Sequence, residues 1–408
     1  MKDPGSARRA LVLVMGLALA ARLAYGLLFV DTGRSDYWEY GELARNLHAG
    51  NGYALFHAHA DSLSFRYDPS ARPVPSAYMP PGYVAFLYPF ICIDAVPLRN
   101  VLLLGAQALL GSFVVGLVFF FTHRHVRPAA ALTAAGITAV LPEFIYATGS
   151  YTPTILYHLF ILLFLIILSG LRRDDRGIGW VGLLSVVSLV LMSLRAESAG
   201  LVLLTALVLW HGRGWKKASV FALLVLMGYA PWVARNAEVF GRPVLLTTSG
   251  GLNLFRGHNP EGRSAWSDDT LDARLAMVPV DSAYEPVVDA LYRARVSELI
   301  AEDPWAGPGR AVAKVLSLWL VDPGDERAGN LFYVLPWGFL LLAFVWGTSR
   351  TRPALPVLMV LAYSTLLAAL FFVLPRYQTM MKVMVVPFAA VGLRDAASRF
   401  VDFLRQKS

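Results

Sequence analysis

The chain has 408 residues, of which 56% are hydrophobic and only 16% are charged. In a soluble domain roughly a quarter of all residues are charged. The composition therefore excludes an ordinary soluble enzyme and predicts an all-α polytopic membrane protein. The net charge of +8 does not indicate nucleic-acid binding, because the basic residues cluster in short connections between apolar runs. Cys92 is the only cysteine, which excludes an internal disulfide and a thiolate metal cluster.

Apolar runs long enough to cross a membrane recur along the chain, and a spanning helix needs about 20 mostly apolar residues. The runs are 10–30, 98–121, 129–147, 152–171, 178–194, 196–211, 217–233, 331–348, 354–374 and 379–395. The first is too long for the core of a signal peptide and lacks a clear cleavage site, so we expect a retained first helix. The stretches 83–93 and 311–321 are too short to span and are expected to be interfacial or re-entrant pieces.

Basic residues fix the expected orientation, because cytoplasmic loops carry an excess of Lys and Arg. If 311–321 does not span, the basic clusters before, between and after the runs all fall on one side. They are Lys2, Arg8, Arg9, Arg124, Arg127, Arg172, Arg173, Arg176, Arg213, Lys216, Lys217, Arg350, Arg352, Arg394, Arg399, Arg405 and Lys407. We therefore expect about ten transmembrane helices in a single integral membrane domain, 1–408, with both ends in the cytoplasm. Segments 31–97 and 234–329 would then lie on the outer face.

The first outer segment opens with "RSDYWEYGELARNLHAGNGY" at 34–53, which predicts a helix from Tyr37 to Leu47 ended by glycines. Asp36 precedes this helix and has two interpretations. It is a helix N-cap, with Glu39 completing a capping-box-like arrangement, or it is a catalytic base at the water–bilayer boundary. Arg34 is a candidate partner that keeps Asp36 ionised.

Further along this segment, "FHAHAD" at 56–61 places His57, His59 and Asp61 at alternating positions, where they would face one side of an extended chain. Such residues can ligate a divalent metal ion, although exposed histidines are more often simply solvated. A divalent metal is therefore an alternative, and no other cofactor is indicated.

The second outer segment contains an amphipathic stretch at 284–304, "YEPVVDALYRARVSELIAEDP". Its spacing predicts a helix on the membrane surface whose apolar face carries Val287, Leu291, Val296 and Ile300. Earlier, "TTSGGLNLFRGHNP" at 247–260 predicts a Gly-rich turn. Its backbone N–H groups could cradle an anion, but without P-loop spacing a structural turn is favoured.

Five pieces of the chain together resemble a known family. They are "SDYWEYGELARNLHAGNGYAL" at 35–55, "MPPGYVAFLYPF" at 79–90, "APWVARNAEVFGRPVLLTTSGGLNLFRGHNP" at 230–260, "EDPWAGPGRAVAKVLSLW" at 302–319 and "LPRYQTMMKVMVVPF" at 374–388. In this order they resemble the bacterial membrane glycosyltransferases of the GT-C type. These are relatives of the dolichyl-phosphate-mannose protein mannosyltransferases and of the aminoarabinose transferase of lipid A.

The resemblance implies a sugar donor on a polyprenyl phosphate and a hydroxyl acceptor at the outer face of a bacterial cytoplasmic membrane, on the periplasmic side. Lipopolysaccharide core, lipid A, cell-wall glycan, another glycolipid and protein hydroxyls all remain open as acceptors. Asp36 matches the first-loop acid of the family and is the candidate general base. The family often has a second acid directly after it, where this chain has Tyr37. Either Glu39 substitutes for that acid or the second acid is dispensable. Inversion at the anomeric carbon is implied by the resemblance alone.

The departing lipid phosphate requires cationic partners. The candidates are Arg376, Lys382 and Arg235. Each has a non-catalytic alternative. Arg376 would be a charge flanking a helix, Lys382 would snorkel to the interface, and Arg235 would be an ordinary interfacial arginine. Arg195 and Glu197 are expected to pair with each other. Aromatic and amide side chains suit sugar contacts, and the candidates are Tyr37, Tyr40, Tyr377, Asn253 and Asn259.

A transporter or lipid flippase is the competing class. It predicts ionisable groups deep in several spanning helices. The predicted helices look almost free of charge, and the polar residues concentrate in the two outer segments. This distribution favours chemistry at one face. A non-catalytic scaffold would be expected to lose the first-loop acid, which this chain keeps.

Overall fold

A computed structural model describes residues 4–34, 37–56, 72–173, 177–262 and 265–407. Over these residues the chain is almost entirely helical, which confirms the all-α prediction. Five helices are long and apolar enough to cross a membrane: α1 (Pro4–Phe29), α4 (Val96–Phe121), α7 (Thr154–Arg173), α10 (Trp215–Phe240) and α15 (Leu331–Arg350). A sixth candidate is the bent pair of α5 (Ala131–Val140) and α6 (Pro142–Gly149).

The other four predicted runs also form helices: α8 (Ile178–Leu194), α9 (Ala199–Arg213), α16 (Leu355–Leu370) and α17 (Pro375–Lys407). Three of them are only 15 to 17 residues long. Each predicted run thus has its helix, while the count of ten spans stays a prediction. Short turns of 3-10 helix follow at Pro128–Ala130, Ala196–Ser198 and Glu326–Gly329, and a π-helical turn covers Thr122–Val126.

The run 129–147 is not one straight helix. Its two halves meet at 48°, with Pro142 in the first turn of α6 and Leu141 before it in an extended conformation. A residue that precedes proline is pushed away from the helical region, so the break follows from the Leu141–Pro142 pair.

Helices α15 and α17 cross very closely. A Cβ added at Gly347 would lie 1.9 Å from the carbonyl oxygen of Phe388, and one added at Gly392 would lie 2.1 Å from that of Ala343. Glycines allow two backbones to approach in this way, as in other membrane helix pairs.

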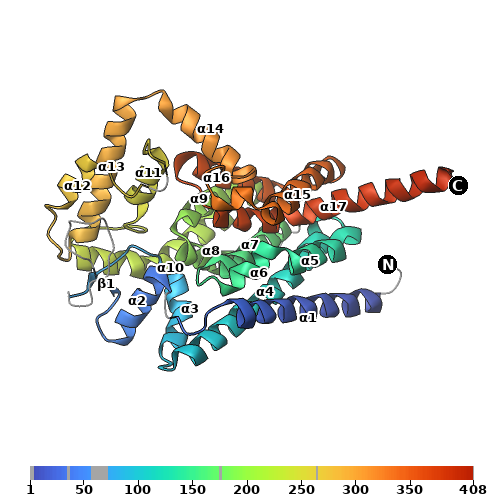
Figure 1. The fold of residues 1–408 in the computed structure, drawn as a ribbon, viewed down its shortest axis with the longest axis horizontal. Coiled ribbons are helices and arrows are strands. Elements are labelled where there is room, and N and C mark those ends of the chain that lie inside the picture. The colour runs from blue at the N-terminus through green and yellow to red at the C-terminus, as the bar shows by residue number, and fades with distance from the viewer. Residues whose placement is uncertain (1–3, 35–36, 57–71, 174–176, 263–264, 408) are drawn as a thin grey trace.

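The remaining elements gather at one end of the bundle, and the start of α1 and the end of α17 lie at the other (Figure 1). From segment 31–97 they are α2 (Trp38–His48), the antiparallel strands β1 (Ala54–Leu55) and β2 (Val74–Pro75), and α3 (Pro81–Ile91). From segment 234–329 they are α11 (Gly250–His258), α12 (Asp269–Leu275), α13 (Tyr284–Glu302) and α14 (Ala306–Trp319). The two segments predicted to share one face therefore share one end.

Helix α13 forms as predicted, and its buried face includes Val296, with Val287 and Leu291 half-buried at its edge, but not Ile300. Its buried apolar residues are Tyr284, Val288, Tyr292, Val296 and Leu299, and the predicted Ile300 is exposed. The helix packs against α11 and α12 because these residues, four or three apart, join the apolar core of this end of the molecule.

Candidate active site

A buried asparagine holds the chain on both sides of Asp36. Asn100 of α4 donates from Nδ2 to the carbonyl oxygens of Thr32 and Arg34, both at 2.6 Å, and its Oδ1 accepts a hydrogen bond from the Tyr37 hydroxyl. Asn100 and Tyr37 are both fully buried. Asp36 lies outside the described residues, so its role as a base stays a prediction.

The start of α2 does not match the predicted capping box. Tyr37 occupies the N-cap position and makes no side-chain capping bond. Glu39 then stands at the second helical position, whereas a capping box needs an acid at the third. Arg34, the suggested partner of Asp36, forms an exposed ion pair with Asp31 at 3.1 Å.

The backbone at the start of α2 is strained. Trp38 has a φ of +56°, in the left-handed region, which costs about 1–2 kcal/mol for a residue with a Cβ. A Cβ added at Gly41 would lie only 2.5 Å from the Cβ of Tyr37, so this tight entry requires glycine there. Strain of this kind concentrates at functional sites.

Two arginines flank one tyrosine near α2. Arg195 follows α8, pairs through Nε with Glu197 as predicted, and places its guanidinium 4.6 Å from the ring centroid of Tyr377. Arg376, in the first turn of α17, lies 5.7 Å from the same centroid and is exposed. Within the described residues Arg376 forms no ion pair, so its guanidinium is open to an anion.

The pKa of the Tyr40 phenol is affected by four charged groups of this region. Burial raises its pKa, the positive charges of Arg376 and Arg195 act to lower it, and the carboxylates of Glu39 and Glu197 act to raise it. Tyr40 therefore lies within electrostatic reach of all four groups. We call Glu39, Tyr40, Arg195, Glu197, Arg376 and Tyr377 the central charged cluster.

Arg235 is engaged elsewhere. Its Nη1 donates to the carbonyl oxygen of Ser76 at 2.6 Å and to Oδ1 of Asn236 at 3.0 Å, and its Nη2 donates to the carbonyl oxygen of Tyr53 at 2.6 Å. Three aromatic rings surround the guanidinium. These contacts fix the chain beside β1 and β2, which is a structural role for this arginine.

Lys382 is fully buried and pairs with Glu143 of α6. Its ammonium group also lies 4.4 Å from the ring centroid of Trp337 and 5.0 Å from that of Tyr333. The snorkelling alternative is therefore wrong, because the side chain points into the bundle toward a carboxylate. A contact with donor phosphate stays a prediction.

The Gly-rich stretch forms helix α11 where a turn was expected. The carboxylate of Asp289 accepts a hydrogen bond from the backbone N–H of Gly251, so a protein carboxylate already occupies the first turn. Asn259 is buried just after the helix, and its Oδ1 accepts from the N–H of Glu261 at 3.0 Å. Asn253 lies half-buried within α11. Their sugar contacts stay a prediction.

The expectation of nearly charge-free helices is wrong at two places. Besides the Lys382–Glu143 pair, Arg22 of α1 is buried and donates to the carbonyl oxygens of Ala18, Thr138 and Ala139 at 3.1–3.2 Å. The bundle thus provides acceptors for both Nη atoms of Arg22, whereas its buried Nε has no hydrogen-bond partner among the described residues.

The suggested metal ligands His57, His59 and Asp61 lie outside the described residues. Among the described residues no group of three His, Cys, Asp or Glu side chains is arranged to hold a metal ion. A divalent metal therefore stays a prediction, and no chemical step below depends on it.

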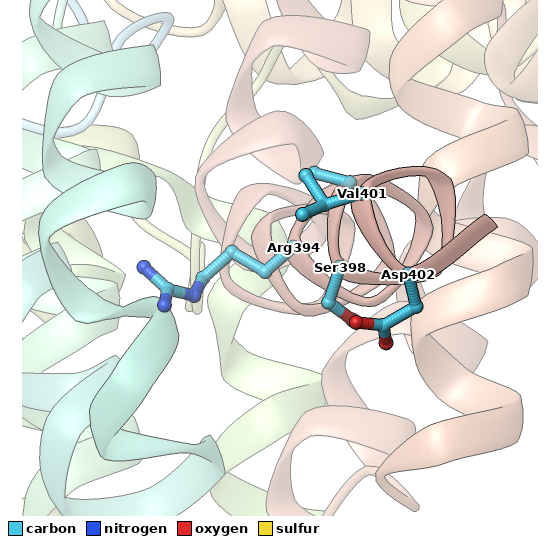
Figure 2. Close-up of a pocket in the computed structure, with 5 residues that line it drawn as sticks. Arg394, Ser398, Val401 and Asp402 are labelled. Atoms are coloured by element: carbon cyan, nitrogen blue, oxygen red, sulfur yellow. The ribbon is translucent and has the colours of Figure 1, made fainter. Parts of the chain in front are cut away.

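A shallow surface hollow lies far from this site, near the C-terminal end of α17. Arg394, Ala397, Ser398, Val401 and Asp402 line it. Figure 2 shows the Arg394 side chain extending away from Ser398 and Asp402. The polar groups do not converge, so the hollow is not a candidate active site.

Two important residues were not anticipated from the sequence, Asn100 and Glu143. Each is a polar residue within an apolar run, which is the signal that could have identified it. Their partners lie in distant segments, so the spacing of neighbouring residues gave no indication of the contacts.

Comparisons with solved structures relate the fold to known proteins. The archaeal oligosaccharyltransferase AglB from Archaeoglobus fulgidus, in complex with an inhibitory peptide and a dolichol-phosphate, matches 98% of this chain with a TM-score of 0.57 and 12% identity. The same protein with Zn and sulfate matches 96% of the chain, again with a TM-score of 0.57 and 12% identity. The matches cover 51% and 49% of the archaeal chain, so this chain spans about half its length.

ArnT from Cupriavidus metallidurans in the apo state matches 95% of this chain and 77% of its own, with 16% identity. Its TM-score of 0.42 is too low to support a conclusion. No protein-family model and no curated protein sequence match the chain. The chain shares the fold of about half of the archaeal oligosaccharyltransferase chain.

Proposed function

We propose that the chain is a membrane glycosyltransferase that moves a sugar from a polyprenyl-phosphate donor to a hydroxyl acceptor. The observation that carries this proposal is the central charged cluster, with its exposed Arg376, beside the segment that Asn100 tethers around Asp36. Cations for a leaving phosphate and a carboxylate for an acceptor proton are the groups that this transfer needs.

In the proposed reaction the acceptor oxygen attacks the anomeric carbon while Asp36 takes the hydroxyl proton. The bond between the anomeric carbon and the phosphate oxygen breaks, and the polyprenyl phosphate leaves with the electron pair. Arg376 binds the phosphate, and Arg195 adds a second positive charge nearby. One displacement of this kind inverts the anomeric carbon. Tyr40 and Tyr377 provide rings for the sugar.

The proposal draws on the fold likeness for the class of donor. The archaeal structure is a complex with dolichol-phosphate and a peptide. For this chain we propose a bacterial cytoplasmic membrane, with the site facing the periplasm. The alternation of basic loops supports this orientation, and so does the gathering of the non-spanning elements at one end (Figure 1).

Arg376→Gln tests the phosphate contact. We expect it to lower transfer by about 10²–10³-fold, because loss of one preorganised electrostatic contact to a developing charge has this effect. Membranes with each variant are incubated with radiolabelled polyprenyl-phosphate sugars and an envelope extract, and label leaving the prenyl-phosphate fraction is measured. Arg242→Gln, at an exposed arginine beyond α10, is the matched control and should transfer normally. Equal rates for both variants would remove Arg376 from the site.

Asn100→Leu tests the tether. It removes both donors to the Thr32 and Arg34 carbonyls and the acceptor of the Tyr37 hydroxyl, so we expect a loss of about 2–4 kcal/mol in the free energy of unfolding. Gln107→Leu is matched, since Gln107 is also buried on α4 and bonded to Tyr83 and Thr148. We expect similar destabilisation from both and a larger loss of transfer from Asn100→Leu. If both variants lose transfer to the same extent, the contacts of Asn100 have only a structural role.

A lipid or sugar flippase is the second candidate, and the buried charges of α1, α6 and α17 are the observation in its favour. The two classes separate in liposomes that contain the purified protein. Movement of labelled polyprenyl lipid across the bilayer, with no sugar transferred, would favour the flippase.

A further inference from the structure

The connection between α16 and α17 carries Arg376 at its end. Residues 371–374 form this connection and are not helical, and Arg376 follows in the first turn of α17. The guanidinium of Arg376 is exposed, and among the described residues no ion pair holds it. Its position therefore depends on the backbone that carries it, so the contacts of residues 371–374 decide where this charge lies.

The end of α11 packs directly against this connection. A Cβ added at Gly257 would lie 2.7 Å from the carbonyl carbon of Phe371 and 2.9 Å from the backbone nitrogen of Phe372. The preceding residue, Arg256, places its guanidinium 4.3 Å from the ring centroid of Phe372 and at the same distance from that of Trp266. The connection thus touches both the backbone and a side chain of the last turn of α11.

Lys314 of α14 joins the two sides of this contact. Its Nζ donates to the carbonyl oxygen of Gly257 at 2.9 Å and to that of Leu370 at 3.2 Å. These carbonyls belong to the last turns of α11 and α16, where helices leave carbonyl groups without intrahelical partners and where a positive charge is favoured. One ammonium group therefore holds the end of α11 to the start of the connection.

The contacts continue from the connection to the central charged cluster. The ring of Phe372 lies 5.9 Å from the ring of Tyr377, against which the Arg195 guanidinium stacks. The N–H of Tyr377 donates to the carbonyl oxygen of Leu374 at 2.8 Å. A shift of the connection would therefore move the ring of Tyr377 and the guanidinium of Arg376 together.

We propose that Lys314 and Gly257 are positioning residues for sugar transfer, because they fix residues 371–374 so that Arg376 faces the donor phosphate. The inference rests on the proposed glycosyltransferase function and on the role of Arg376 within it. Neither Lys314 nor Gly257 touches the donor, and both act through Arg376. The competing interpretation is that they only stabilise the packing of α11, without an effect specific to Arg376.

The charge of Lys314 gives its role a pH dependence. Burial, followed by the positive charge of Arg310 on the same helix, lowers the pKa of Lys314 to about 8. His258 of α11 is within electrostatic reach of Lys314, and burial lowers the pKa of this histidine. Helix α16 contains no charged residue. The ammonium group is therefore positive below pH 8, and it loses its proton, and part of its hold on the two carbonyls, as the pH rises through this value.

Lys314→Met removes both donations but keeps an unbranched side chain. We expect kcat/KM for the polyprenyl-phosphate sugar to fall by about 10²-fold, the loss that a displacement of about 1 Å can cause. In an Arg376→Gln background the same change should cost little more, because residues that act through one another are not additive. A purely structural role would lower transfer equally in both backgrounds.

Lys314→Arg is the conservative variant, and it should restore most of the transfer. Wild type should lose transfer as the pH rises through about 8. Lys314→Arg should keep its rate to higher pH, because arginine stays protonated there. The same alkaline fall in wild type and Lys314→Arg would exclude Lys314 as its source.

Gly257→Ala tests the backbone contact while Lys314 is kept. Alanine forms helix better than glycine, so an effect on α11 alone would be stabilising. We expect a loss of transfer instead, because the new Cβ pushes the connection away from α11. Gly250→Ala on the same helix is the matched control. Its Cβ would meet the flexible end of the Arg293 side chain, which can move aside, so transfer should stay normal.

Amide hydrogen exchange of the purified protein provides a readout that needs no sugar transfer. Peptides that cover residues 371–377 should exchange faster in Lys314→Met and Gly257→Ala than in wild type, Lys314→Arg or Gly250→Ala. Unchanged exchange in both variants would overturn the proposal, as would equal losses of transfer with and without Arg376. A wild type that transfers no sugar would contradict the glycosyltransferase proposal, whereas the exchange result would still show whether Lys314 holds the connection.

Discussion

Asp36→Asn is expected to lower sugar transfer by about 10²–10⁴-fold, the usual contribution of a general base, while expression and folding stay unchanged. Asparagine keeps the size of the side chain and its ability to bond backbone N–H groups, but it cannot take the acceptor's proton. Asn100 bonds the carbonyls of Thr32 and Arg34 and the hydroxyl of Tyr37, so the flanking chain should keep its position. Loss of activity would then reflect the missing proton acceptor.

Asp31→Asn is the matched control for this experiment. Asp31 lies five residues before Asp36, and its exposed carboxylate pairs with Arg34 and accepts a hydrogen bond from the N–H of Gly33. Asparagine can still accept the Gly33 bond and an exposed ion pair contributes little, so the variant should transfer at nearly the normal rate. Glu39→Gln separates the two candidate acids. A full rate for Asp36→Asn together with a large loss for Glu39→Gln would move the base to Glu39, and full rates for both would end the general-base hypothesis for this segment.

The fold was largely readable from the sequence because it depends on local signals. Each apolar run became a helix, and the short stretches 83–93 and 311–321 correspond to α3 and α14, which are 11 and 14 residues long. The break within 129–147 also has a local cause, the Leu141–Pro142 pair, although it was not predicted. Hydrophobicity and proline geometry act over a few residues, so a single sequence contains them.

The candidate site was only partly readable, because its contacts join distant segments. The Arg195–Glu197 pair was predicted, since the two residues are neighbours in a turn. The contact of Arg195 with Tyr377 was not, because these residues lie on different helices. The buried face of α13 was predicted only in part for a related reason. Both faces of that helix carry apolar residues, and only the position of α11 and α12 decides which face is buried.

Lys382→Met is expected to cost about 3–5 kcal/mol of stability, the usual effect of removing one partner of a buried ion pair. Lys382 is fully buried, and its loss would leave the carboxylate of Glu143 without its partner inside the bundle. Thermal unfolding of the purified protein in detergent should show a clear fall in Tm. Arg399→Met, which breaks an exposed ion pair with Asp395 on the same helix, should change Tm little.

The double variant Glu143→Leu and Lys382→Met decides between the two roles of this lysine. Replacing a buried ion pair with apolar side chains is often neutral or stabilising, so we expect Tm to return toward that of wild type. If the pair is structural, as its burial indicates, transfer returns as well. If Lys382 also binds the donor phosphate, stability recovers while transfer stays low. If neither Tm nor transfer recovers, Glu143 and Lys382 do not act as a pair. The buried contact would then support neither a structural role nor a phosphate-binding role for Lys382.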